Sequence, residues 1–271
     1  MDARTRALLD APILPTLLRM ALPNTLVLVA QAGAGLIETY FVGRLGTDAL
    51  AGMALVFPLV MLMQRWAGGA VGGGVSSAIA RALGAGRRAD ADALAVHAIL
   101  IGAVLGLLCT LGLLSGGAWL YARMGASGEV LRAALAYSDW VFAGAVLVWL
   151  FNTLAAIVRA TGNMAVPATV TLVGTVALLP LSPLLIFGWG PVPALGIAGG
   201  ALALLFYYGA GALALGWYLR SPRSLLALRL GGRGWQKWMF RDILGVGLLG
   251  AVSTVATNAA IGIATAQAAH F

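Results

Sequence analysis

Residues 93–120 read ALAVHAILIGAVLGLLCTLGLLSGGAWL and contain no Asp, Glu, Lys or Arg. An α-helix needs about 20 apolar residues to cross the hydrocarbon core of a bilayer. The run is solidly apolar rather than alternating, and it is longer than a strand of a membrane β-barrel. It therefore predicts a transmembrane helix.

Six further stretches of the chain are long and apolar enough to span a membrane. They lie at about 20–42, 50–76, 137–158, 165–188, 194–219 and 243–269. The composition agrees, because 61% of the residues are hydrophobic and only 10% are charged, against roughly 25% charged in globular proteins. This excludes a water-soluble globule. We expect an all-α integral membrane protein with seven spans.

The basic residues predict how the spans are oriented. With a cytoplasmic N-terminus, thirteen of the 17 Lys and Arg residues lie on the inner side and one, Arg65, lies within a span. The outer side has only Arg44, Arg123 and Arg132. Inner loops of membrane proteins are enriched in Lys and Arg, so we expect a multi-pass protein of the cell inner membrane with its N-terminus inside. The net charge of +8 then reflects topology and does not indicate nucleic-acid binding.

The chain divides into three segments. We expect residues 1–219 to form a six-span unit, 220–241 a basic amphipathic cytoplasmic linker, and 242–271 a seventh span that begins an incomplete second unit. The linker mixes basic residues with Leu225, Trp235 and Trp238. That mixture is typical of a segment lying on an anionic leaflet, although a solvated basic loop is the alternative. A retinal protein is excluded, because the only lysine, Lys237, lies in the linker.

Glu38 is the first candidate functional residue. It lies about five residues below the outer end of the first span. An ionisable group inside a membrane is costly to bury and is a functional candidate by default. A carboxyl in this position could take up and release a proton. The alternative is an interfacial glutamate paired with Arg44.

Arg65 is the second candidate, near the middle of the second span beside Gln64. If the first two spans are antiparallel, Arg65 lies about 20 Å deeper than Glu38 at the helical rise per residue. It either faces a watery cavity or snorkels toward the inner surface.

Other polar side chains and several helix-perturbing residues also lie within the spans. The polar ones are Gln31, Asn152 and Asp139, and each either lines a substrate cavity or makes an interhelical hydrogen bond. Prolines can bend helices, so the bent helices around Pro23, Pro180 and Pro183 are candidate gates. Glycines crowd the second span at a spacing that permits close helix packing, namely at Gly68, Gly69, Gly72, Gly73 and Gly74.

The sequence contains no P-loop, no His-Glu-x-x-His, no Gly-x-Ser-x-Gly and only one cysteine, Cys109. These are the signatures of nucleotide, zinc, hydrolase and disulfide chemistry. We therefore expect no enzyme activity, no metal and no cofactor. If the protein moves a substrate, an ion gradient drives the movement.

Three stretches together resemble the multidrug and toxic compound extrusion (MATE) family. They are ETYFVGRLGTDALAG at 38–52, ARALGAG at 80–86 and RATGNMAVP at 159–167. The resemblance implies one half of a transporter with twelve spans in two six-helix lobes. This chain would be the N-terminal lobe, the linker and most of the seventh span, without the C-terminal lobe that transport requires.

The sequence departs from the family pattern at two places. Glu38 stands where the family usually has aspartate. In the fifth span the family often shows Asn-x-x-x-Asp-Pro, whereas residues 178–183 read LLPLSP and leave only the hydroxyl of Ser182. The resemblance also implies an uncharged residue where this chain has Arg65.

The resemblance implies an antiporter that exports organic cations or drugs by alternating access, in exchange for protons or sodium. Glu38 would be the ion-coupling carboxyl. The substrate cavity would be lined by Gln31, Gln64, Arg65, Asn152 and Asp139. The alternatives are a flippase for a lipid-linked precursor, which should show a more basic cavity, and a membrane sensor or assembly protein that transports nothing.

Overall fold

The computed structural model describes residues 12–226 and 236–268, and these are almost entirely helical. The elements in chain order are α2 (Ile13–Gly43), α3 (Thr47–Gln64), the π-helix η1 (Arg65–Val71), α4 (Gly72–Gly84), α5 (Arg88–Arg123), α6 (Gly128–Ala143), α7 (Ala145–Ala160), α8 (Ala165–Phe187), α9 (Ile197–Arg220) and α10 (Lys237–Ala268). Within these residues the only β pairing is an isolated bridge between Trp189 and Val192. The prediction of an all-α protein is confirmed.

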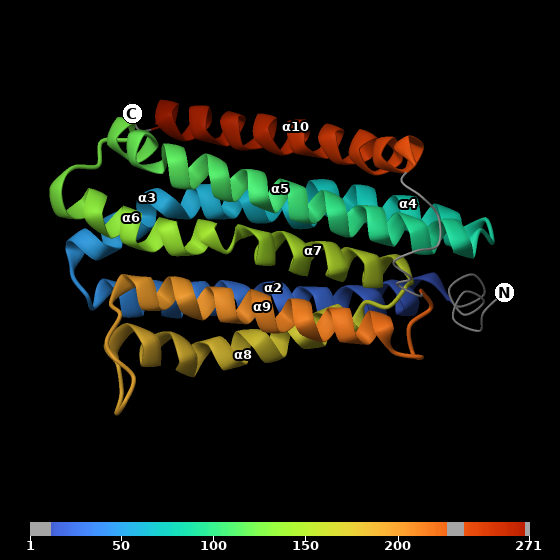
Figure 1. Ribbon diagram of the computed structural model, residues 1–271, viewed down its shortest axis with the longest axis horizontal. Coiled ribbons are helices and arrows are strands. Elements are labelled where there is room, and N and C mark those ends of the chain that lie inside the picture. The colour runs from blue at the N-terminus through green and yellow to red at the C-terminus, as the bar shows by residue number, and fades with distance from the viewer. Residues whose placement is uncertain (1–11, 227–235, 269–271) are drawn as a thin grey trace.

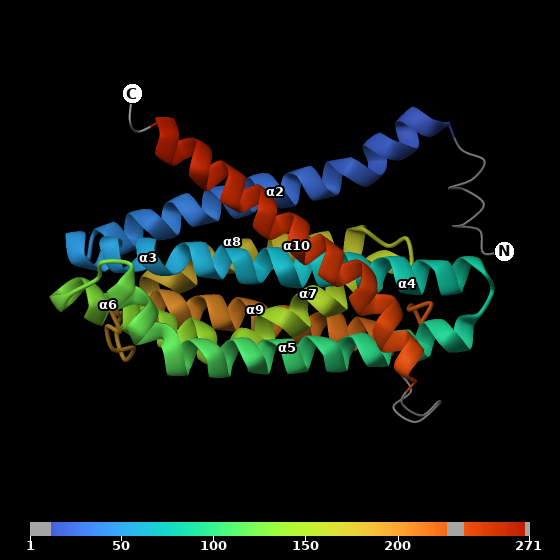
Figure 2. The ribbon, with the colours of Figure 1, turned by 90° about the horizontal axis from the view of Figure 1, so that it is seen from above.

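The helices form the six spans that the hydropathy predicts, and α10 covers the seventh stretch. Five helices are long and apolar enough to cross a membrane: α2, the continuous α3–η1–α4 helix, α5, α8 and α9. The remaining span, the fourth in chain order, is the pair α6 and α7, which is bent by 48°. Figures 1 and 2 show the spans side by side along the long axis of the molecule.

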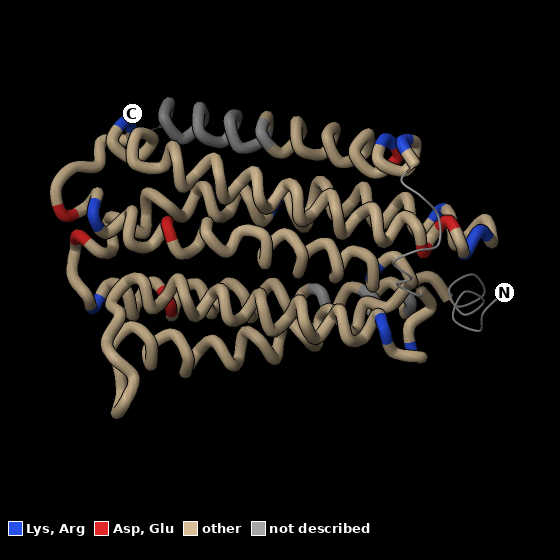
Figure 3. The backbone as a smooth tube through the Cα atoms, viewed as in Figure 1, with Lys and Arg blue, Asp and Glu red and all other residues tan. Residues whose placement is uncertain are grey.

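The charged residues gather at the two ends of the bundle and leave its middle almost free of charge (Figure 3). Basic residues are concentrated at the end where α4 and α9 finish and where α5 and α10 begin. This is the end that the arginine count assigns to the cytoplasm.

The core surrounds α7, in which ten of the sixteen residues are buried. Its contact with α5 depends on two glycines, because a Cβ at Gly106 would lie 2.7 Å from the Val146 Cα and one at Gly102 would lie 2.6 Å from the Thr153 Oγ1. Helices in a membrane associate chiefly by such close packing. Trp149 and Phe142 fill the space between the backbones and are buried.

The π-helix η1 interrupts the second span without bending it into separate helices. Such π-bulges inside α-helices occur often at functional sites. Two of the five glycines predicted to pack closely face α7, since a Cβ at Gly68 would meet Asn152 and one at Gly72 would approach Ala156. Gly74 faces α10 instead. Gly69 and Gly73 have no atom within 4 Å of an added Cβ.

The helix α10 packs across η1 and α4 (Figure 2). A Cβ at Gly74 would lie 2.3 Å from the Ile243 carbonyl oxygen, so the two backbones are almost in contact. Gly250 approaches Ala70 in the same way. The Arg81 guanidinium and the Asp242 carboxylate form an ion pair of 2.7 Å at the basic end. The seventh predicted span therefore has neighbours within this chain.

Both described ends of the predicted linker pack against protein. The Arg88 guanidinium donates to the Leu225 carbonyl oxygen at 3.0 and 2.6 Å. The Gln236 backbone N–H donates to the His97 Nε2 at 3.1 Å, and Leu226 is buried. Residues 227–235, which include Trp235, lie outside the described residues, so the membrane-surface interpretation of the linker stays a prediction there.

The prolines lie inside continuous helices. The assigned helix runs through Pro23 in α2 and through Pro180 and Pro183 in α8. The bend above 40° between consecutive described helices is at Gly144, between α6 and α7. The assignment of the prolines as gates stays a prediction.

Candidate ion and substrate site

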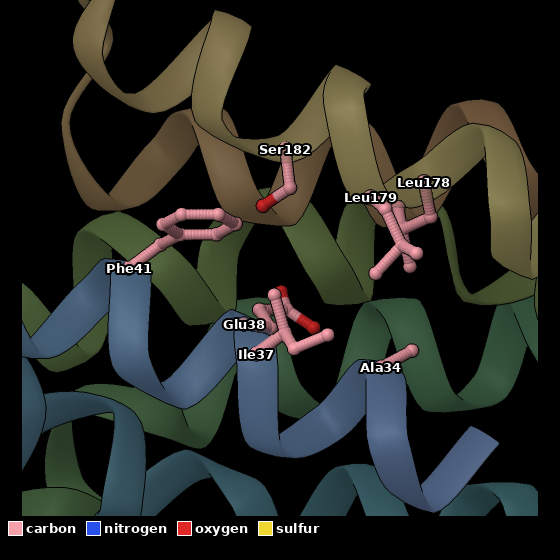
Figure 4. Close-up of a pocket in the computed structure, with 7 residues that line it drawn as sticks. All are labelled: Ala34, Ile37, Glu38, Phe41, Leu178, Leu179 and Ser182. Atoms are coloured by element: carbon pink, nitrogen blue, oxygen red, sulfur yellow. The ribbon is translucent and has the colours of Figure 1, made fainter. Parts of the chain in front are cut away.

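A small pocket lies between α2 and α8, toward the end of the bundle opposite the basic end. Its lining residues are Ala34, Ile37, Glu38, Phe41, Leu178, Leu179 and Ser182. Figure 4 shows the Glu38 carboxyl and the Ser182 hydroxyl both extending into the space between the two helices. The pocket is therefore apolar except for these two groups.

Within the part of the chain that the structure describes, one oxygen of each polar group in the pocket has no hydrogen-bond partner. The Glu38 Oε1 and the Ser182 Oγ are both buried and unpaired. Buried polar atoms without a partner are uncommon in proteins and call for an explanation. The proposed pair between Glu38 and Arg44 is not among the ion pairs of the described residues.

Three residues from α6 and α9 lie near the Glu38 carboxyl. Tyr137 and Tyr208 lie near enough to interact electrostatically with its carboxyl, and both are buried. A Cβ at Gly200 would lie 3.4 Å from the Glu38 Oε1. Glu38 is thus enclosed by four helices, and no basic side chain is among these neighbours.

Gln31 belongs to a second polar group, two turns from Glu38 on α2. It lies beside the Tyr207 hydroxyl, together with Thr171 and Thr175 of α8. The Tyr207 hydroxyl is buried and makes no aligned hydrogen bond to any of them. The α2–α8–α9 region therefore has polar side chains at two depths.

Three predicted cavity residues lie away from the Glu38 pocket. Gln64 and Arg65 are near the middle of the second span, and Asn152 lies opposite them on α7. Gln64 is half-buried and Arg65 is exposed. Asn152 donates from Nδ2 to the Val148 carbonyl oxygen at 2.9 Å and turns its Oδ1 toward Gly68 of η1. The predicted cavity residues therefore lie in two places: Gln31 is in the α2–α8–α9 region, and the other three are around the middle of the second span.

Asp139 does not line the Glu38 pocket. It is exposed on α6, and its electrostatic neighbour is Tyr121. Tyr137, two residues earlier, faces Glu38 instead. A cavity role for Asp139 stays a prediction.

Sequence reasoning assigned neither Tyr137 nor Tyr208 to the site. The available signal was the pair Tyr207 and Tyr208 in the middle of an apolar helix. Among the described residues, no group of three or more His, Cys, Asp or Glu side chains could hold a metal ion.

Comparisons with known proteins give the family. The MatE family model matches residues 23–184. The chain belongs to the MATE family. Members of this family are transporters rather than enzymes, and this MATE chain is a multi-pass membrane protein.

Relatives of this MATE chain differ in what they are named for. An FAD transporter of Shewanella oneidensis is 36% identical over 200 residues, which cover 73% of this chain and 44% of that protein. A probable multidrug resistance protein NorM of Deinococcus radiodurans is 34% identical over 212 residues, covering 71% and 44%. A solved MOP superfamily transporter from Pyrococcus furiosus superposes with a TM-score of 0.83 at 28% identity, over 90% of this chain and 53% of that one. The chain spans about half the length of these relatives, as the resemblance to an N-terminal half implies.

Proposed function

We propose that the complete protein is an ion-coupled exporter of amphipathic organic compounds, with its N-terminus in the cytoplasm and its spans in the cell inner membrane. Family membership and relatives such as the NorM protein support the export of organic solutes. Two lobes would move against each other around a central cavity, as in other transporters with repeated halves. The second lobe is required for this movement.

The observation that carries the coupling proposal is the buried, unpaired Oε1 of Glu38. An ionised carboxylate in an apolar pocket is costly unless a cation neutralises it. A proton or a sodium ion bound to Glu38 supplies that charge. Exchange then follows if ion binding and substrate binding favour opposite orientations of the lobes, because each ligand shifts the population toward the state it binds better.

Glu38→Gln in the full-length polypeptide tests this role. It removes the titratable group and preserves the shape, so we expect ion-driven export to be lost while membrane insertion stays intact. Glu38→Asp should keep substantial activity. Export is measured in everted vesicles as accumulation of a fluorescent substrate after an ion gradient is imposed.

Glu129→Gln is the matched control. It makes the same chemical change at a carboxyl that is exposed at the start of α6 and outside the pocket, so transport should stay near the wild-type level. Wild-type export by Glu38→Gln would show that Glu38 does not couple the ion.

A further inference from the structure

Arg65 lies at the middle of the second span. The α3–η1–α4 helix runs from Thr47 to Gly84, with eighteen residues before Arg65 and nineteen after it. At about 1.5 Å per residue, each end of the helix is roughly 27 Å away. With this helix centred on a hydrocarbon core about 30 Å thick, Arg65 would lie roughly 15 Å from either surface. An extended arginine side chain is shorter than that distance, so we infer that snorkelling does not solvate the guanidinium.

The helix around Arg65 has three faces, and Arg65 is on the uncovered one. Gly68 and Gly72 face α7. A second face packs against α10. Its contacts are Ala70 with Gly250, Val71 with Gly247, and Gly74 with Ile243. Arg65, Gly69 and Gly73 are exposed, and the space around both glycines is open.

The uncovered face adjoins the face of the same helix on which α10 packs through Ala70, Val71 and Gly74. Figure 2 shows α10 crossing this helix and α2 diverging from α4. A charged residue in a membrane almost always faces the bundle interior or a water-filled cavity, so Arg65 fits a cavity between the lobes.

The guanidinium of Arg65 has no counter-charge among the described residues. It takes part in none of their ion pairs or side-chain hydrogen bonds. The acidic residues of the described helices lie toward the two ends of the bundle: Glu38, Asp48, Glu129 and Asp139 on the outer side, and Asp90, Asp92 and Asp242 at the basic end. Glu38 is five residues from the end of α2. At the helical rise this leaves about 20 Å of depth between Glu38 and Arg65.

We propose that Arg65 binds an anionic group of the transported compound, so that this exporter carries organic anions. The proposal rests on the exporter function proposed above. A guanidinium binds carboxylate, sulfonate or phosphate groups through two parallel hydrogen bonds. In a water-filled cavity with apolar walls of low dielectric constant, an uncompensated positive charge attracts an anion and repels a cation. This differs from the organic cation that the family resemblance implies.

Two xanthene dyes of opposite charge test the proposal, namely carboxyfluorescein (anionic) and rhodamine 6G (cationic). Equilibrium binding to the full-length protein in lipid nanodiscs is followed by fluorescence anisotropy without an ion gradient. We expect wild type to bind carboxyfluorescein at least about tenfold more tightly than rhodamine 6G. Arg65→Gln should lose that preference, and Arg65→Lys should keep most of it. Arg132→Gln, which removes an arginine at the outer surface, should leave it unchanged.

These outcomes separate the two proposals. If wild type prefers rhodamine 6G, binds neither dye, or keeps its preference in Arg65→Gln, the anion proposal is overturned. The exporter proposal is judged separately, by gradient-driven movement of any substrate in the Glu38 experiment. A carboxylate that pairs with Arg65 from elsewhere in the full-length protein would abolish the anion preference and so count against the proposal.

A thiol-labelling experiment keeps Arg65 itself intact. Gly69→Cys, in a background with Cys109→Ala, places a thiol one turn from Arg65 in open space. The anionic reagent MTSES and the cationic reagent MTSET are compared, each relative to a free thiol. We expect both to react and MTSES to be favoured, with the ratio falling about tenfold when Arg65→Gln is added. If the thiol reacts with neither reagent, or the ratio does not change, position 65 does not present a positive charge to a watery cavity.

Discussion

Ser182 and Glu38 are the two polar residues of the pocket, and each has a buried oxygen without a hydrogen-bond partner. These two oxygens make the pocket a candidate ion site. A buried hydroxyl without a partner lowers stability, yet the Ser182 Oγ is held in that state against α2. A cation bound to Glu38 would use the Ser182 Oγ as a second ligand. If Glu38 is protonated instead, its O–H would donate a hydrogen bond to the Ser182 Oγ. The cost in stability is then offset by ion binding.

Ser182→Ala separates stability from ion binding. Removing an unpaired hydroxyl should leave the unfolding temperature of the detergent-solubilised protein unchanged or slightly higher. The apparent affinity for the coupling ion should fall roughly tenfold, because a hydrogen bond to a charged group contributes about 1.5–3 kcal/mol and about 1.4 kcal/mol is tenfold. Unfolding temperatures and the ion-concentration dependence of export are the measurements.

Ser138→Ala provides the matched control for this experiment. Its hydroxyl is also buried and unpaired, but it lies beside Tyr121 and outside the pocket. We expect a similar effect on stability and none on ion affinity. Equal effects of the two substitutions on the ion dependence would remove Ser182 from the site.

At the scale of elements, glycine packing holds α10 on the second span. The Arg81–Asp242 ion pair is half-exposed on its arginine side, and surface ion pairs contribute only about 0–1 kcal/mol. The contact between Gly74 and the Ile243 carbonyl is between backbones and cannot yield as a flexible side chain would. Steric complementarity therefore outweighs the ion pair.

Gly74→Ala should weaken the attachment of α10, because overpacking of this kind typically costs about 1–3 kcal/mol. Gly73→Ala should be neutral or stabilising, since its Cβ meets no atom within 4 Å and alanine favours a helix over glycine by about 1 kcal/mol. The measurement is disulfide formation between Ala70→Cys and Gly250→Cys.

The geometry suits this readout. A Cβ at Gly250 would lie 3.4 Å from the Ala70 Cβ, close to the separation found in disulfides. Replacing Cys109 with alanine removes the background thiol. Undiminished cross-linking in Gly74→Ala would show that another contact positions α10.

At the scale of the whole molecule, the described helices form a bundle in which the face of the second span that carries Arg65 is uncovered. Arg65, Gly69 and Gly73 present that face, and relatives are about twice as long as this chain. Facing lipid would leave the guanidinium without partners at a cost of several kcal/mol. A second lobe that covers this face would create the cavity and solvate the charge.

Expressed alone, the 271-residue chain should insert into the membrane but should not confer drug resistance, because alternating access needs two bundles that move against each other. The measurement is accumulation of both xanthene dyes in an efflux-deficient strain, with insertion checked by membrane fractionation. The opposite outcome is that this chain exports a dye and that export stops when the ion gradient collapses. That result would establish a half-size exporter formed from two copies of the chain.

The sequence by itself determined which segments cross the membrane. Hydropathy is a local property, so runs such as 93–120 give a span wherever they occur, and the arginines predict its direction. Glu38 and Arg65 could be recognised because a charge inside an apolar run is visible without knowing its neighbours. Their depths followed from the constant rise of a helix.

Only the tertiary structure decided which face each residue occupies and what lies opposite. Ser182 is 144 positions after Glu38, and nothing in either segment shows that α8 brings its hydroxyl into the same pocket. The π-helix η1 likewise rotates the residues that follow it by an amount that the apolar pattern does not reveal. Almost every side of a membrane helix is apolar, so hydrophobic periodicity, which reveals the buried face of a soluble helix, carries little information here. In this bundle, small residues and close packing determine which helix faces contact each other, and only the assembled structure shows those contacts.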